Sequence, residues 1–512
     1  MQESWGIEGF CSTDESFEFI DIIPSSSTSV SSTEMLSVNT SQPIPMKKSL
    51  SSPISNRTKP LTAQQFQEFL DKDGRLVDEN ALRKAIFLGG VEPDVRKEVW
   101  KFLFGLYPCS YTKRERGVLL FDYILKYHEM KSRWKTILVL SSKPGASPYE
   151  QGLVPKYLLD ESQQGLRSPG FQFEDPISES SKHNLVSQAT QVISGQPDFS
   201  SLSTDCSDLD LNSNETRQQL EFMKIQAQVY VNRLKIDVND MRDHLRIVDK
   251  DVPRTDRDYP YFSGPCNPHL GVLREILITY ATFHPEVGYA QGMNDILSRF
   301  LVVFDSEVEA YWCFHHYLDR IQQDFTETGM VSKIELVRKL LQEMDPDLLD
   351  HLNQHNLADL LFCHRWLLLG FKREFNFMDS LRLFEILSSH HLELSSMEAK
   401  KVRHREQLKE FANVDGMSRT LAVESEAEYT FELFMCVALL KECRSSLMQC
   451  TDSAEVFVCI NGLKIDLDNI LKKSELLFFQ YCKKTVEESF LMVESPQMST
   501  QKSTSKHATG VL

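Results

Sequence analysis

The sequence lacks the motifs by which many nucleotide-binding and hydrolytic enzymes are recognised. It contains no G-x-x-x-x-G-K-[ST] loop, no G-x-G-x-x-G turn, no H-E-x-x-H pair and no G-x-S-x-G elbow. Each motif supplies one piece of chemistry: a phosphate cradle, a zinc site or an activated serine. Their absence indicates that the chain carries no nucleotide loop of its own.

Paired cysteines are missing as well. None of the 11 cysteines stands in a C-x-x-C pair, and the spacing of Cys436, Cys443 and Cys450 does not suit zinc ligands. We therefore expect reduced, mostly buried thiols, as is usual in the cytoplasm.

Membrane signals are also lacking. Residues 1–10 are acidic without an apolar core, and the longest apolar stretch, residues 296–304, is too short to span a bilayer. Gln2 excludes myristoylation, and the final ATGVL has no cysteine for prenylation. We predict a cytoplasmic protein that reaches membranes only through partners.

The charge balance argues against a nucleic-acid partner. Lys and Arg total 56 against 73 Asp and Glu, and the resulting net charge of -17 repels a phosphate backbone. The composition is 41% hydrophobic with 31 Phe, which is enough to bury a large core.

Composition divides the chain into folded and disordered parts. Residues 24–60 and about 141–214 are rich in polar and turn-forming residues, too poor in large apolar groups to offset the entropy of ordering. Residues 395–427 are charged and weakly amphipathic, which indicates a second insert. The predicted parts are a disordered segment at 1–60, the folded domain at 61–140, 215–394 and 428–494, inserts at 141–214 and 395–427, and a disordered tail at 495–512.

Helical periodicity dominates the folded parts, and no alternating strand pattern occurs, so we predict an all-α fold. Residues 95–104 repeat apolar side chains at helical spacing, with Arg96, Lys97 and Lys101 expected to face solvent. The predicted core residues include Trp100, Trp312, Trp366 and Phe375.

Two helix starts are especially clear. Asn267 followed by Pro268 is a capping residue with proline at the first helical position, and His284-Pro285 ends that helix. Apolar spacing in residues 293–304 predicts a new helix from about Gly292, which places Gln291 at a helix N-terminus.

Two further motifs stand in order within this helical chain. Residues 248–257 read VDKDVPRTDR, and 34 positions after Thr255 begins the stretch YAQGMND, residues 289–295. They resemble the I-x-x-D-x-x-R and Y-x-Q-G fingerprints of TBC domains, which activate Rab GTPases. Val248 stands where Ile is usual, a conservative change at an expected core position. Arg96 to Trp100 resembles the R-x-x-x-W opening of the same domain.

The resemblance implies a two-lobed helical TBC domain over roughly residues 61–484, apart from the two inserts. It implies that Arg254 and Gln291 act as catalytic fingers on a GTP-bound Rab, supported by Asp251, Thr255, Tyr289 and Gly292. In this family the glutamine is thought to orient the attacking water. GTP and Mg²⁺ would belong to the Rab, so no cofactor is expected in this chain.

Transferring a phosphoryl group spreads negative charge over its oxygens, and an inserted arginine neutralises that charge. Arginine suits this task because its guanidinium is planar, permanently charged and rich in donors. A lone exposed arginine would more often be an ordinary surface charge. The two motifs in order are what favour the catalytic interpretation of Arg254.

Several neighbouring residues admit two interpretations. Asp251 could cap a helix or hold the Arg254 guanidinium, and Arg257 could be a surface charge or contact the GTPase. Asp295 occupies a favourable position in the first helical turn. His364 and the pair His315-His316 are interpreted as structural, and no metal site is expected.

The N-terminal residues 14–22, DESFEFIDI, suggest a second binding activity. Phe17 with Ile20, and Phe19 with Ile22, fit an aromatic-x-x-aliphatic pattern with acidic neighbours. Such segments resemble those that bind ubiquitin-like autophagy modifiers by adding a strand to a sheet edge. The TBC motifs most resemble an autophagy-linked family member, so recruitment to vesicle or autophagosome membranes is expected.

The rival interpretation is a non-catalytic adaptor that binds a Rab or an autophagy modifier. Presence of both finger residues argues against it. The identity of the Rab depends on surface shape, which the sequence does not give.

Overall fold

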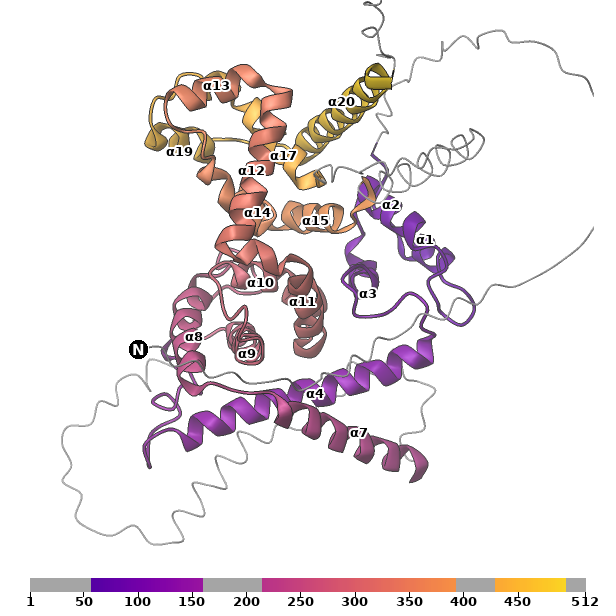
Figure 1. Ribbon diagram of the computed structural model, residues 1–512. Coiled ribbons are helices and arrows are strands. Elements are labelled where there is room, and N and C mark those ends of the chain that lie inside the picture. Colours follow the sequence, from indigo (N-terminus) through magenta and orange to yellow (C-terminus); the bar gives the residue numbers. More distant parts are fainter. Residues whose placement is uncertain (1–56, 160–213, 393–428, 494–512) are drawn as a thin grey trace, which may run out of the picture. The chain divides into compact units, whose positions relative to one another are not determined.

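The computed structural model describes residues 57–159, 214–392 and 429–493 (Figure 1). Contacts divide the chain into residues 1–51 and 52–512, and every described residue belongs to the second unit. In these ranges the secondary structure consists of helices. Two isolated β-bridges also occur, one between Leu61 and Val91 and one between Leu70 and Leu76. The predicted all-α class is confirmed.

Buried side chains form two hydrophobic cores. The helices of the first core are α1 (Ala63–Glu68), α3 (Pro93–Leu103), α4 (Lys113–Leu140), α7 (Asn214–Arg233), α8 (Val238–Asp251), α9 (Pro268–Phe283), α10 (Met293–Phe304) and α11 (Glu307–Ile321). Those of the second core are α12 (Glu327–Met344), α13 (Pro346–Gln354), α14 (His364–Leu369), α17 (Phe431–Glu442), α18 (Arg444–Leu447), α19 (Ser453–Asn461) and α20 (Leu467–Val493). Short 3-10 turns connect them: η1 (Lys156–Leu158), η3 (Val252–Arg254), η4 (Gln322–Phe325), η5 (Leu361–Cys363) and η6 (Lys372–Glu374).

Two helices contribute to both cores. In α15 (Phe377–Ser388), Leu381 and Phe384 join the first core, whereas Leu383 and Ile386 join the second. The helix α2 (Glu79–Gly89) divides in the same way and packs against α15. The two cores agree with the predicted two lobes and are joined through apolar faces rather than by a linker.

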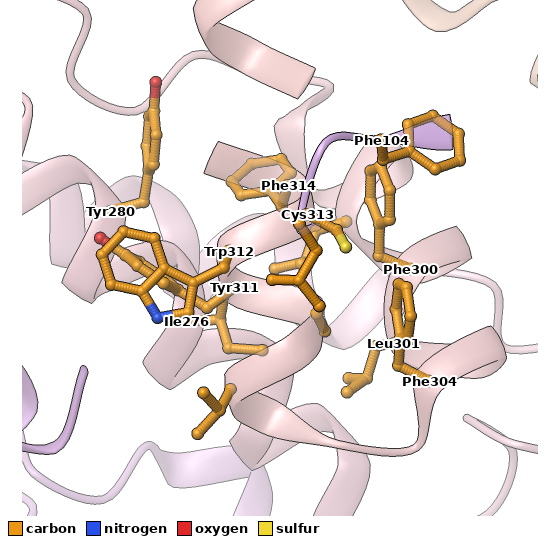
Figure 2. Close-up of a cluster of buried hydrophobic side chains, with 14 of the residues drawn as sticks. Phe104, Ile276, Tyr280, Phe300, Leu301, Phe304, Tyr311, Trp312, Cys313 and Phe314 are labelled. Atoms are coloured by element: carbon orange, nitrogen blue, oxygen red, sulfur yellow. The ribbon is translucent and has the colours of Figure 1, made fainter. Parts of the chain in front are cut away.

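Aromatic rings fill the first core around α10 and α11 (Figure 2). The ring centroids of Phe104 and Phe300 lie 4.8 Å apart, and Trp100 lies 4.8 Å from Phe104 and 5.6 Å from Phe300. Each buried aromatic or aliphatic side chain contributes roughly 1.5–3 kcal/mol to folding. The core residue predictions hold for Trp100, Trp312 and Trp366, while Phe375 is only partly buried against the second core.

The predicted helix starts are confirmed. The Asn267 side chain accepts the His269 amide at 2.9 Å, Pro268 follows at the first helical position, and α9 ends at Phe283. Gly292 is the N-cap of α10. Val248 is fully buried, as expected of a core position. In the described residues no helix is long and apolar enough to cross a membrane.

The prediction of a disordered insert from residue 141 is wrong for its first part. Residues 141–159 are described, and Leu153 is buried in the first core. Arg274 of α9 donates to the carbonyl oxygens of Gly152 at 2.7 Å and Leu153 at 3.3 Å. The segment is held by this buried arginine, which local composition could not reveal. The remainder of that insert, the insert at 395–427 and the tail lie outside the described residues.

Arg96 and Lys101 do not face solvent, contrary to the prediction. Both are buried, because α3 packs against two fully buried carboxylates, Glu385 of α15 and Glu309 of α11. Lys97 remains partly exposed, although its ammonium also lies 2.8 Å from Glu309. A buried carboxylate requires a cation or donor nearby, and α3 supplies them.

Glu385 is expected to be one of the costliest side chains to remove. Its carboxylate accepts hydrogen bonds from Arg96, from the Trp100 indole at 2.8 Å and from the Val91 amide at 3.0 Å. Glu385→Ala leaves a buried cation without its partner, so unfolding in urea should show a loss of about 3–5 kcal/mol. The control is Glu335→Ala, whose ion pair with Arg338 is exposed and should cost less than about 1 kcal/mol. Equal losses in the two variants would contradict this account.

Candidate functional site

The two motif segments occupy adjoining loops. The first runs from the end of α8 through η3, and the second lies between α9 and α10, with α8 and η3 both packed against α9. The Arg254 side chain is 59% exposed and Gln291 is exposed, while Asp251, Thr255 and Tyr289 are buried beneath them. Two exposed polar side chains therefore lie above a layer of buried polar side chains.

Asp251 connects the two loops through its carboxylate. Its Oδ1 accepts a hydrogen bond from Arg254 Nη2 at 2.5 Å, and its Oδ2 accepts one from the Tyr289 hydroxyl at 2.8 Å. It makes no side-chain cap at η3. Of its two interpretations, the structure shows the one in which Asp251 holds the guanidinium.

Tyr289 stays protonated in this environment. Its burial, followed by the neighbouring Asp251 charge, raises the pKa of the phenol well above its ordinary value. The hydroxyl is therefore a donor at any physiological pH, and its proton goes to Asp251. The ring fixes the start of the second loop against the end of the first.

Asn294 is a site residue that sequence reasoning missed. It is buried in the first turn of α10, donates from Nδ2 to Thr255 Oγ1 at 2.9 Å, and accepts the Gly292 amide at 3.2 Å. Thr255 in turn donates to the Asp251 carbonyl at 3.0 Å. The available signal was a polar residue inside an otherwise apolar helical stretch, two positions after Gly292.

Two glycines set the backbone around Gln291. Gly292 has φ +107°, and a Cβ there would lie 2.9 Å from Leu369 Cδ2. Gly288 has φ +64°, and a Cβ there would lie 2.6 Å from the His244 ring. Residues with a side chain rarely adopt either conformation, and a Cβ at either position would lie too close to a neighbouring side chain. The main chain carrying Gln291 is therefore closely constrained.

Asp295 does more than occupy a favourable position in the first turn. It is buried and pairs with Lys372 at 3.2 Å and Arg373 at 2.7 Å. Burial opposes ionisation, but these two cations hold the pKa of Asp295 below its ordinary value. Lys372 also binds Asp256 at 2.6 Å. The loop after Arg254 and the start of α10 are thus tied to the same element, η6.

The Arg257 guanidinium forms a hydrogen bond with another part of the same chain. It is partly buried and donates to the Gly264 carbonyl. This bond closes the loop that leads to α9, so the side chain has a structural role whether or not it also contacts a partner.

A group with metal-ligand character lies on α11. In the described part of the chain, His315, His316 and Asp319 are the residues whose ligand atoms converge, within 4.8 Å of one another. Burial lowers the pKa of His315 to about 3 and of His316 to about 4, so both rings are neutral. His316 Nε2 lies 3.2 Å from the Tyr123 hydroxyl, consistent with the structural interpretation. His364 is exposed.

The arrangement offers a specific chemistry to a partner. A guanidinium fixed by a buried carboxylate presents its outer face to solvent, where it can stabilise negative charge on a reacting group. An exposed carboxamide on a constrained loop can orient a water molecule. The candidate binding residues Phe17, Phe19, Ile20 and Ile22 lie outside the described residues.

Comparison with known proteins adds independent information. Residues 196–399, which include Arg254 and Gln291, match the model of the Rab-GTPase-TBC domain, RabGAP-TBC. The human protein TBC1 domain family member 25 is 32% identical over 330 residues, covering 64% of this chain and 34% of the relative. GTPase-activating protein GYP7 of Debaryomyces hansenii is 29% identical over 341 residues, covering 65% of this chain and 37% of the relative.

The chain therefore spans little more than a third of the length of these curated relatives. Among solved structures, the crystal structure of the Ypt/Rab-GAP domain of Gyp1p aligns with 81% of this chain and 96% of that chain. The TM-score of this alignment is 0.46 and the sequence identity is 18%.

Proposed function

We propose that the chain stimulates GTP hydrolysis by a GTP-bound Rab GTPase, because residues 196–399 match the model of the Rab-GTPase-TBC domain. One observation carries the proposal. Arg254 is 59% exposed, yet its guanidinium is anchored by a carboxylate that is itself buried. The name of the relative GYP7, a GTPase-activating protein, supports the same activity.

Arg254 acts as an arginine finger in this proposal. During hydrolysis the transferring phosphoryl group carries its negative charge on equatorial oxygens, and the guanidinium stabilises that charge. Asp251 fixes the orientation before the Rab arrives, so less side-chain entropy is lost on insertion. The expected benefit is roughly 10³–10⁵ in rate, or about 4–7 kcal/mol of barrier.

Gln291 supplies the second finger and orients the attacking water. It is exposed next to the N-cap of α10, and the glycines on either side of it leave the main chain little freedom. A carboxamide held in this way can accept a hydrogen bond from water through its oxygen and donate one to a phosphate oxygen through its nitrogen at the same time. The Rab's own catalytic glutamine is then not required.

The cellular process follows from the partner. A Rab substrate implies a role in vesicle trafficking, with the chain brought to membranes by its partners. The segments Phe17 to Ile20 and Phe19 to Ile22 extend the proposal to ubiquitin-like autophagy modifiers. That extension rests on sequence pattern alone.

The first prediction of the proposed function concerns Arg254. Arg254→Ala should reduce stimulated hydrolysis by about 10³ or more, and Arg254→Lys should also fail, because an ammonium cannot reproduce the planar fork. The measurement is single-turnover GTP hydrolysis with the best substrate in a panel of Rabs.

Arg246→Ala is the matched control. Arg246 lies on α8 and pairs with Asp243 at the same three-residue spacing and the same 2.5 Å distance, but both partners are exposed. The control should retain full activity. Near-normal stimulation by either Arg254 variant would remove this residue from the mechanism.

The second prediction separates two fingers from one. A Rab whose catalytic glutamine is changed to Leu should remain a substrate, and Gln291→Ala should abolish activity on both forms while sparing affinity for the GTP complex. Gln354→Ala, at the exposed end of α13, is the control.

The outcomes are distinct. Stimulation of the normal Rab but none of the Leu form would refute the glutamine finger while leaving the arginine finger intact. Tight binding of GTP-loaded Rabs without stimulation of any would favour the adaptor instead.

A further inference from the structure

Asn294 lies where the two finger loops meet. It is 4% exposed, and its carboxamide bonds to one atom from each loop, Thr255 Oγ1 and the Gly292 amide. We propose that Asn294 is a positioning residue that couples the arginine loop to the glutamine loop, so that both fingers are set as one unit. The inference deepens the proposed function and rests on it for its catalytic consequence.

The two groups that hydrogen-bond to Asn294 determine which end of its carboxamide carries the oxygen and which the nitrogen. The Gly292 amide can only donate, so the atom facing it must be the oxygen. Thr255 Oγ1 gives its own proton to the Asp251 carbonyl, so it must accept from the Asn294 nitrogen. Both assignments agree, and no other rotation of the amide satisfies both neighbours.

Each of the two hydrogen bonds of Asn294 is connected to one of the finger residues, Gln291 or Arg254, through only a few bonds. The Gly292 nitrogen belongs to the peptide group that follows Gln291, so the 3.2 Å bond fixes the plane of that peptide. On the other side, Thr255 holds the Asp251 main chain, and the Asp251 carboxylate holds Arg254. The Tyr289 hydroxyl, which donates its proton to Asp251 at 2.8 Å, also lies 3.2 Å from Asn294 Oδ1, so its ring packs where the two loops meet.

Asn294 acts through these neighbours rather than on a partner. Its side chain is almost fully covered, so it does not reach the surface that Arg254 and Gln291 present. Removing it leaves the Gly292 amide and the Thr255 hydroxyl short of a partner in a buried place. Small displacements of reacting groups are costly, since about 1 Å of misplacement can cost 10²-fold in rate.

The first test needs no catalytic activity. In the full chain carrying Asn294→Ala, hydrogen exchange should accelerate in peptides covering residues 251–257 and 286–293 together, while α13 keeps its protection. The control is Asn376→Ala, which removes an exposed helix-cap asparagine at α15 and should leave both loops unchanged. Acceleration confined to residues 286–293, or spread over the whole domain, would overturn the inference.

The second test reads the catalytic consequence on a responsive Rab. Asn294→Ala should lower kcat by about tenfold or more with KM changed less than about threefold, because the binding surface is intact. Thr255→Val removes the same bond, so the double variant should lose no more than the worse single variant. A wild-type kcat in Asn294→Ala, or fully additive losses, would refute the coupling.

The two tests separate this inference from the proposed function. If the wild-type chain stimulates no Rab, the proposed function fails, and the exchange experiment still decides whether Asn294 couples the loops.

Discussion

The Asp251 carboxylate is the group on which the site depends. Burying a charged carboxylate costs several kcal/mol unless donors surround it. Here one oxygen is occupied by Arg254 and the other by Tyr289, so the two loops compensate the burial together. Since each loop supplies one donor, neither can move away without leaving a buried charge partly unpaired. The buried Asp251 carboxylate thereby determines the position of the exposed Arg254 side chain.

The remaining constraints act in the same direction. Gly288 and Gly292 adopt backbone conformations that residues with a side chain rarely adopt. At the start of α10, Asp295 forms ion pairs with Lys372 and Arg373. The main chain that carries the exposed side chains of Arg254 and Gln291 is therefore fixed by packing, turn geometry and ion pairs. A preorganised site of this kind loses little free energy to reorganisation when a charge develops on a partner.

Local patterns were sufficient to predict much of this architecture. Capping at Asn267 and the apolar spacing of residues 293–304 predicted the helix starts, and the helical periodicity predicted the all-α class, whereas the segments of the site were identified by their resemblance to two TBC-domain motifs. The helix starts and the fold class depend on residues within one or two helical turns, which is why the sequence alone reveals them.

Features that depend on distant partners were not predictable. Arg96 and Lys101 carry charges typical of a solvated face, and the two fully buried carboxylates that pair with them, Glu385 and Glu309, lie far along the chain. Residues 141–159 have the composition of a loop but are held by Arg274. Asn294 was overlooked because its role appears only when Thr255 is brought beside it.

The central claim is that the exposed face of Arg254 acts on the transition state of a partner's GTP hydrolysis. It is tested most directly by measuring binding of the chain to a GDP-loaded Rab with and without aluminium fluoride, a mimic of the transferring phosphoryl group. Transition-state analogues bind about 10² or more times tighter than ground states. The account predicts a gain of at least this size for the wild-type chain and its loss in Arg254→Ala. Equal affinity in both conditions, or an undiminished gain in Arg254→Ala, would contradict it.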